Sequence, residues 1–182
     1  MGSLTIELPA QTAQREFNMR RWAELLADPK LARIEGRIET DRHGHIIMTP
    51  PPGARHGMFQ AEIAFQLRNQ ILDGRVLTEC PISTADGVRA ADVAWASAER
   101  MQELGNGQLF SSAPDVCVEV LSPDNTEAEI REKRALYFDA GAKEVWICAQ
   151  SGAITFYLAA GAHTPAPISQ LVPHFPARIN LS

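Results

Sequence analysis

The sequence has few cysteines and no long apolar run, and each absence excludes a class of protein. Its 182 residues contain three cysteines, Cys80, Cys117 and Cys148. They are odd in number, lie in apolar segments and show no paired spacing, which is typical of reduced core thiols and unlike a disulfide framework or a zinc site. No run approaches the ~18 apolar residues of a membrane span. We therefore expect a soluble protein.

Positive charge is also scarce, and a secretory signal is missing. The formal net charge is -5 and the pI is near 5.5. This balance argues against a protein that coats nucleic acid without specificity, because such binding depends on Lys and Arg neutralising phosphates. The N-terminus MGSLTIELPAQTAQREF has no positively charged region followed by an apolar one. The cytoplasm is the expected location.

Length and pattern predict a single domain, residues 1–182, with no linker or repeat. Within it we expect a helical N-terminal extension (1–30), a core (31–160) and a C-terminal tail (161–182). Apolar periodicity predicts helices at 11–27 and 56–72, strands at 31–38, 45–48, 75–79, 88–96, 115–121, 144–149 and 153–158, a helix after Asn125 that Gly141 ends, and a looser segment at 97–112. This order predicts an α/β (α+β) fold in which helices flank a mixed β-sheet.

The strand around Glu119 contains the first candidate site residue. Val116, Val118 and Val120 share one face of this strand, and Glu119 lies on the other face. A carboxylate in such an apolar strand is costly unless it is paired, hydrogen-bonded or bound to a metal. A purely structural role for Glu119 is the alternative interpretation.

The helix that follows this strand supplies a candidate lysine. Ile130, Lys133 and Tyr137 lie at i, i+3 and i+7, so Lys133 points with the apolar stripe. Residues Ser122 to Asn125 end the strand and offer capping side chains for the helix. The alternative is that Lys133 forms a surface ion pair with Glu129, four residues earlier.

A second carboxylate, Asp92, lies within the apolar strand VRAADVAWA. It shares a face with Ala94; the alternative is an aspartate at a strand edge or turn. Two inward carboxylates on neighbouring strands and a lysine can hold a hard divalent cation and place a water beside it. The ammonium group can stabilise negative charge that develops during reaction, or it can orient and assist the attacking water. Phosphodiester hydrolysis uses all three groups.

Three segments resemble the Uma-two family of putative restriction endonucleases, a branch of the PD-(D/E)XK nuclease superfamily. They are MTPPPGARHG, ADVAWASAERM and EVLSPDN...K...Y...GAKEVW, within a likeness that runs from about Ile34 to Leu158. The resemblance implies a restriction-endonuclease-like core with Asp92 and Glu119 as metal-binding carboxylates. It also implies that the main-chain carbonyl of Val120 completes the metal shell.

The chain departs from the family pattern at three positions. The usual lysine two residues after the glutamate is replaced by Leu121, and the resemblance implies that Lys133 takes its role. Ala91 precedes Asp92 where a proline is usual. Glu129 is found where an aspartate often precedes the helix lysine by four residues. The changes at Ala91 and Glu129 leave the charged groups of the site in place.

Other polar residues near these motifs are weaker candidates. His56 begins a predicted helix after a proline-rich turn, from which it could reach a phosphate or a water; the alternative is a polar helix-start residue. Glu35, Glu129 and Glu62 are candidate outer carboxylates.

The sequence thus predicts an endonuclease of DNA that depends on Mg²⁺, which Mn²⁺ can replace, with Asp92, Glu119 and Lys133 as catalytic residues. A homodimer is expected, since two symmetric sites most simply cut both strands of a duplex. One alternative is an inactive nuclease-like domain that binds nucleic acid or a protein partner. Another is a hydrolase that uses two carboxylates on a different bond, such as a glycoside.

Overall fold

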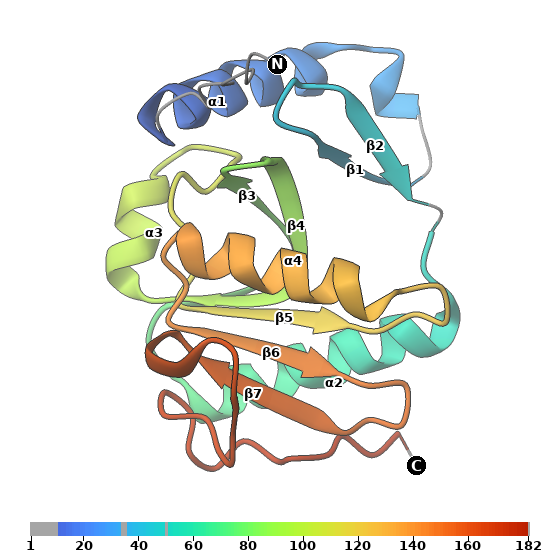
Figure 1. Cartoon of the computed structure of the whole chain (residues 1–182), viewed down its shortest axis with the longest axis vertical. Helices are drawn as coiled ribbons and strands as arrows, with labels where there is room; N and C mark the ends of the chain where they lie inside the picture. Colours follow the sequence, from blue (N-terminus) through green and yellow to red (C-terminus); the bar gives the residue numbers. More distant parts are fainter. Residues whose placement is uncertain (1–10, 34–35, 50, 182) are drawn as a thin grey trace, which may run out of the picture.

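A six-stranded mixed sheet with the order β3-β4-β5-β6-β7-β8 forms the centre of the protein in a computed structural model that describes residues 11–33, 36–49 and 51–181. Figure 1 shows this sheet with a second, two-stranded sheet above it. The elements are α1 (Gln11–Ala27), η1 (Leu31–Arg33), β1 (Arg37–Thr40), β2 (Ile46–Thr49), α2 (Ala54–Gln70), β3 (Arg75–Thr84), β4 (Gly87–Ala96), α3 (Ala98–Leu104), β5 (Val116–Val120), α4 (Glu127–Asp139), β6 (Glu144–Cys148), β7 (Ile154–Leu158), η2 (Ala159–Gly161) and β8 (Pro165–Ala166).

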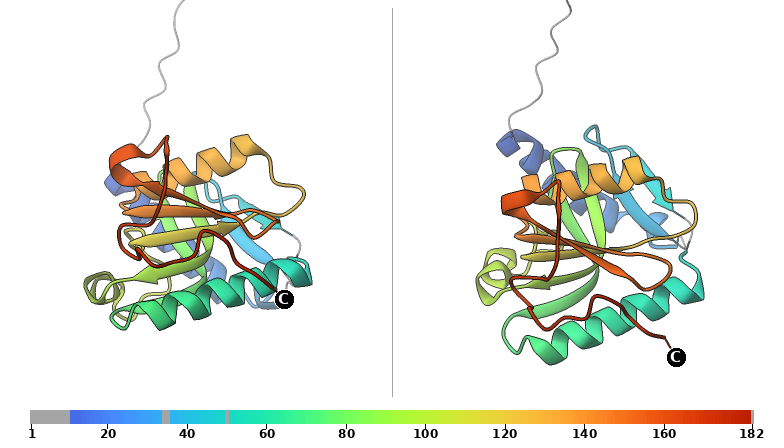
Figure 2. Two further views of the ribbon diagram at one scale, coloured as in Figure 1. Left: turned by 90° about the horizontal axis from the view of Figure 1, so that it is seen from below. Right: turned by 60° about the horizontal axis from the view of Figure 1, so that its bottom comes forward.

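The two faces of the large sheet are covered by different helices. Strands β5 and β6 are parallel and are joined through α4, whereas the other neighbours in the sheet are antiparallel. The three views agree that α4 covers one face and α2 the opposite face (Figures 1 and 2). The predicted mixed sheet flanked by helices is confirmed.

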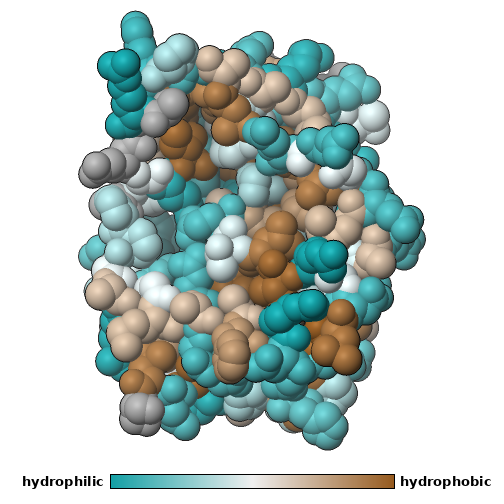
Figure 3. Space-filling model, turned by 180° about the vertical axis from the view of Figure 1, so that it is seen from behind, coloured by the Kyte–Doolittle hydropathy of each residue, from teal (hydrophilic) through white to brown (hydrophobic). Residues whose placement is uncertain are grey.

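Helix α2 packs on the sheet through residues spaced four apart. Phe59, Ile63 and Leu67 are buried against the sheet, as their period predicts. Its outer side is partly apolar, because Met58 and Phe65 are exposed. The space-filling view from behind, the side on which α2 lies, shows apolar side chains scattered among hydrophilic ones (Figure 3).

The predicted alternation of β5 is also found. Val116, Val118 and Val120 belong to the core cluster on the α2 side of the sheet, whereas Cys117 belongs to the cluster on the other side. Because side chains alternate along a strand, Glu119 points to the same side as Cys117. That side is the one covered by α4.

Three predicted boundaries are wrong. Strand β3 continues to Thr84, beyond its predicted end at residue 79. Residues 31–33 form the 3₁₀ turn η1, and the strand begins only at Arg37. The turn is favoured because Asp28 accepts hydrogen bonds from the Lys30 amide at its Oδ1 (2.8 Å) and from the Leu31 amide at its main-chain oxygen (3.1 Å). The segment expected to be loose, 97–112, contains α3.

Side-chain caps explain why α3 forms within residues 97–112 and where α4 begins. The Ser97 hydroxyl accepts a hydrogen bond from the Arg100 amide (3.3 Å) and starts α3. Thr126, rather than a residue of 122–125, caps α4. It forms a capping box in which its hydroxyl accepts from the Glu129 amide (3.2 Å) and the Glu129 carboxylate accepts from the Thr126 amide (2.8 Å).

The N-terminal helix and the C-terminal segment are both attached to the core. Trp22 and Leu25 of α1 are buried with Val88, while Leu26 is half exposed. Val172, Phe175 and Ile179 of the segment predicted as a tail are buried in the core cluster that also contains Phe59, Ile63 and Leu67 of α2. Among the residues described by the structure, no helix is long and apolar enough to cross a membrane.

Candidate active site

Asp92 on β4 and Glu119 on β5 are the two carboxylates around which the candidate site is built. The register that pairs Val93 with Val118 brings Asp92 and Glu119 to adjoining positions of neighbouring strands. Only 1% of Asp92 and 4% of Glu119 is exposed. Both line a cavity of about 600 Å³, together with Lys133.

Glu119 is held at both oxygens by residues of α4. The Tyr137 hydroxyl donates a 2.6 Å hydrogen bond to Oε1, and Nζ of Lys133 lies 3.2 Å from Oε2. Burial raises the pKa of Glu119 to about 7, although the positive charges of Lys133 and Arg37 favour its ionised form. Tyr137, which the sequence placed only on the apolar stripe, is therefore the residue that orients this carboxylate.

Lys133 points into the cavity and not toward the surface. Its Nζ lies 3.1 Å from Oε1 of Glu39, in addition to its contact with Glu119. Burial alone would lower the pKa of Lys133, but the two carboxylates outweigh this effect and the pKa lies above its usual value. The alternative of a surface pair with Glu129 does not apply, because Glu129 is engaged in the capping box.

Asp92 has both of its oxygens engaged. Oδ1 pairs with the guanidinium of Arg37, and Oδ2 accepts a 2.6 Å hydrogen bond from the Val120 amide and lies 3.3 Å from Nε2 of His56. Burial would raise the pKa of Asp92, but the hydrogen bond to His56 and the charge of Arg37 hold it below its usual value. Asp92 is therefore an ionised carboxylate.

His56 lies in the first turns of α2, as expected, and its side chain is 12% exposed. Its contact with Asp92 raises the pKa of His56 above the usual value, against the opposing effect of burial. Nδ1 of His56 is buried and has no hydrogen-bond partner among the described residues. The ring is thus fixed at Asp92 and lines the cavity.

Sequence reasoning missed two residues of β1, Arg37 and Glu39. Glu39 is 6% exposed, and its Oε1 also accepts a 2.9 Å hydrogen bond from the Ala90 amide. The two residues flank Ile38, which packs in an apolar cluster on the other side of the strand. This alternation was the available signal, and placing the strand at 31–38 concealed it.

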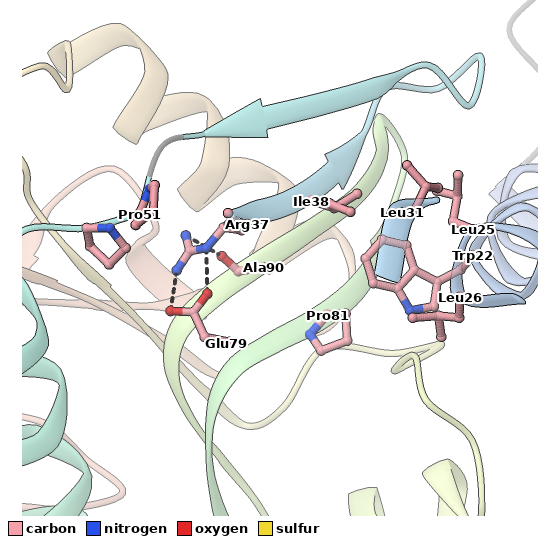
Figure 4. A pocket seen from close by; sticks show the side chains of 12 residues that line it. Trp22, Leu25, Leu26, Leu31, Arg37, Ile38, Pro51, Glu79, Pro81 and Ala90 are labelled. Carbon is pink, nitrogen blue, oxygen red and sulfur yellow. Dashed lines mark hydrogen bonds and ion pairs between the residues drawn. The ribbon is translucent and has the colours of Figure 1, made fainter. Parts of the chain in front are cut away.

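Arg37 is bound to Glu79 of β3 as well as to Asp92. Its guanidinium donates hydrogen bonds of 2.7 and 3.0 Å to the two carboxylate oxygens of Glu79 (Figure 4). Glu79 lies opposite Asp92 in the β3–β4 register and has a φ of +51°, a left-handed conformation that is strained for a non-glycine residue. Gln60 of α2 donates to the Asp92 main-chain oxygen (2.8 Å) and to Oε1 of Glu79 (2.9 Å).

The remaining candidates lie at varied distances from this centre. Val120 lines the cavity and bonds to Asp92 through its amide. Glu129 lines the same cavity but is exposed, and its hydrogen bonds with Thr126 lower its pKa. Glu62 bonds to Gln66 on α2 and does not line the cavity. Glu35 lies outside the described residues.

The donors present fit a hard divalent cation. Among the described residues, no group of three or more His, Cys, Asp or Glu side chains is arranged to hold a metal ion. Mg²⁺ does not need such a cage, since it usually keeps several waters and binds through one or two carboxylates. Asp92 and Glu119 supply these carboxylates from adjoining strands, and Val120 could add its main-chain oxygen.

Comparisons with known proteins agree with this architecture. The crystal structure of a putative nuclease from Anabaena variabilis ATCC 29413 is similar, with a TM-score of 0.65 and 18% sequence identity over 82% of this chain and 92% of that chain. No match is found among curated proteins. The model of the Uma2 (Uma-two) family, described as a putative restriction endonuclease, matches residues 22–176. The chain therefore belongs to the Uma2 family.

Proposed function

We propose that the protein is an endonuclease that hydrolyses DNA phosphodiester bonds with Mg²⁺, or with Mn²⁺ in its place. The observation that carries this proposal is the convergence of Asp92, Glu119 and Lys133 in one cavity. Family membership supports a nuclease, and the arrangement of charges supports this chemistry.

Each residue has a distinct part in the proposed reaction. Asp92, Glu119 and the main-chain oxygen of Val120 would hold the metal, which polarises a phosphoryl oxygen and lowers the pKa of a bound water. Tyr137 fixes the orientation of Glu119. Lys133 carries a positive charge beside Glu119, where it can stabilise negative charge on the phosphoryl group in the transition state.

An inactive nuclease-like domain that binds nucleic acid or a protein partner is the second candidate. It is favoured because both oxygens of Asp92 already have partners, namely Arg37, His56 and the Val120 amide, which occupy the positions that a metal would take. A glycoside hydrolase is a third, because two carboxylates flank one cavity. Metal dependence and cleavage distinguish the three candidates. A pair of glycosidase carboxylates requires no metal, and a binding domain does not cleave its ligand.

Cleavage of supercoiled plasmid separates these functions. The parent protein should nick or linearise the plasmid with Mg²⁺ or Mn²⁺ and should leave it intact in EDTA. Asp92→Asn and Glu119→Gln should abolish cleavage, whereas Glu16→Gln, on the exposed side of α1, should cut like the parent. A pure, folded parent protein that leaves plasmid intact with every metal contradicts the proposal and favours the binding domain.

We further propose that the protein acts as a two-fold homodimer in the cytoplasm. Two symmetric sites can cut both strands of a duplex, and closed two-fold dimers are the commonest oligomers.

A further inference from the structure

Arg37 lies between two cavities. It lines the cavity that contains Asp92 and Glu119, and it also lines a neighbouring cavity of about 650 Å³. Figure 4 shows this second cavity, with Arg37 and Glu79 at one end and the apolar side chains of Trp22, Leu25 and Ile38 at the other. Glu79 lines only the second cavity and Asp92 only the first. The guanidinium therefore bridges one carboxylate of each cavity.

Of the groups that occupy the oxygens of Asp92, Arg37 is the one that can leave. The Val120 amide is part of the β5 backbone and cannot move without breaking the sheet. The His56 ring is attached by a short side chain to the start of α2. Arg37 reaches Asp92 on a long, flexible arm. Its Nη2 donates to both Asp92 and Glu79, whereas its Nε donates to Glu79 alone and can keep that 2.7 Å hydrogen bond when Nη2 leaves Asp92.

An entering metal would also lie beside positive charge. The buried carboxylates of Glu39, Asp92 and Glu119 line the catalytic cavity together with the cations of Arg37, Arg89 and Lys133. A divalent cation at Asp92 would place like charge next to the Arg37 guanidinium, which is costly in a buried site. Departure of the guanidinium from Asp92 would relieve this repulsion.

We propose that Arg37 is an exchangeable counter-ion of Asp92: a divalent metal binding at Asp92 displaces the guanidinium, which stays paired with Glu79 at the wall of the second cavity. This exchange rests on the proposed function, because it requires that Asp92 be a metal ligand. It makes Arg37 and the metal competitors for one carboxylate, and it gives Glu79 the role of holding the arginine once it has been released.

Binding of Mn²⁺, measured by calorimetry on the full chain without DNA, tests the exchange. Arg37→Gln removes the competitor, so its Mn²⁺ affinity should rise, by roughly the 5- to 150-fold typical of coupling between sites. Glu79→Gln removes the alternative partner of the arginine, so its affinity should fall by a comparable factor. In the double variant the effect of Glu79→Gln should disappear, because no arginine remains to be held. Arg131→Gln, on the exposed side of α4, should bind as the parent does.

The opposite signs distinguish exchange from a structural role. If the Arg37–Glu79 pair only supports the fold, both variants should lose stability and weaken Mn²⁺ binding together, which overturns the proposal. Arg37→Lys keeps a charge on a folded site and should bind Mn²⁺ with an affinity between those of the parent and Arg37→Gln. If all variants bind equally, the exchange is wrong and the metal site is retained. If none binds, Arg37→Gln included, the metal part of the proposed function fails as well.

Discussion

Lys133 and Glu39 are 94 residues apart in the sequence, and Nζ of the lysine lies 3.1 Å from Oε1 of the glutamate. The same ammonium contacts Glu119, so α4 is connected through one side chain to both β1 and β5. The position of Lys133 therefore depends on the small sheet as well as on its own helix. Its aliphatic arm is buried with the apolar stripe, and its charge is compensated twice.

Replacement of Lys133 tests whether this residue acts in catalysis or only in packing. Lys133→Met should keep the fold and much of the metal binding, but it should lower plasmid cleavage by roughly 10²- to 10³-fold, the usual cost of losing one electrostatic contact to a transition state. Initial rates with Mg²⁺ at equal protein concentration provide the measurement. Circular dichroism and calorimetry with Mn²⁺ check the fold and the metal site.

A control for this variant should come from the exposed side of the same helix. Arg131→Met is suitable because it removes a positive charge outside the cavity. Lys143 is less suitable as a control, because its Nζ is 2.7 Å from Oδ1 of the buried Asp115 and its replacement would disturb the core. Equal cleavage by the Lys133 and Arg131 variants would show that Lys133 has no catalytic role.

Metal binding should depend on both carboxylates. Calorimetric titration of the parent protein with Mn²⁺ should give a binding signal that Asp92→Asn or Glu119→Gln abolishes, because each removes a negatively charged ligand. Glu16→Gln serves as the control for a carboxylate outside the site. Titration curves of the two site variants that match the parent would place the metal elsewhere.

Tyr137→Phe tests the group that orients Glu119. The lost hydroxyl donates a 2.6 Å hydrogen bond to a buried carboxylate, and such bonds to charged groups contribute about 1.5–3 kcal/mol. The free energy of unfolding in urea should fall by about that amount, and plasmid cleavage should fall with it because Glu119 is less well positioned. Tyr157→Phe, at a half-buried position outside the cavity, should change neither quantity appreciably. Equal effects of the two variants would contradict this role.

Asp115 should make stability depend on pH in the acid range. Burial would raise the pKa of Asp115, but the contact with Lys143 and the 2.8 Å hydrogen bond from the Ser97 amide hold it below the usual value of 3.8. The folded state therefore binds this proton less readily than the unfolded state. The resulting stabilisation is full above the unfolded pKa of about 3.9 and is lost as pH falls through the lower folded pKa.

Comparison of the parent with Asp115→Asn measures this contribution. The variant should be less stable at pH 7, by on the order of 1 kcal/mol for one net hydrogen bond, and the difference should shrink as pH falls below about 4. Urea unfolding at a series of pH values provides the data. A difference that stays constant, or grows toward acid pH, would contradict this assignment.

Self-association is the last expectation to be tested. Sedimentation velocity at micromolar concentration should give the mass of a two-fold dimer, twice the 20.0 kDa of the chain. Plasmid that is linearised in one binding event would agree with two coupled sites. A single species of monomer mass would count against the dimer and would favour sequential nicking of the two strands.

Local patterns in the sequence predicted the central β5–α4–β6 unit of the fold and two of its carboxylates. The alternation of valines in β5 and the four-residue repeat of Phe59, Ile63 and Leu67 in α2 follow from the side-chain periods of a strand and a helix, which are local properties. The same local reasoning placed Asp92 and Glu119 within apolar strands. These two charged residues could be identified because apolar residues surround them in the sequence.

The groups that surround these carboxylates could not be predicted from local patterns, because they depend on how the elements pack. Arg37 and Glu39 belong to β1, which approaches Asp92 and Glu119 from a distant part of the chain, and ion pairs between distant residues have no sequence period. Local capping by Asp28 and Ser97 also moved two boundaries that apolar pattern alone had misplaced. Short-range periodicity thus predicts which face of an element is buried, whereas the partner of a buried charge is fixed by how the elements pack.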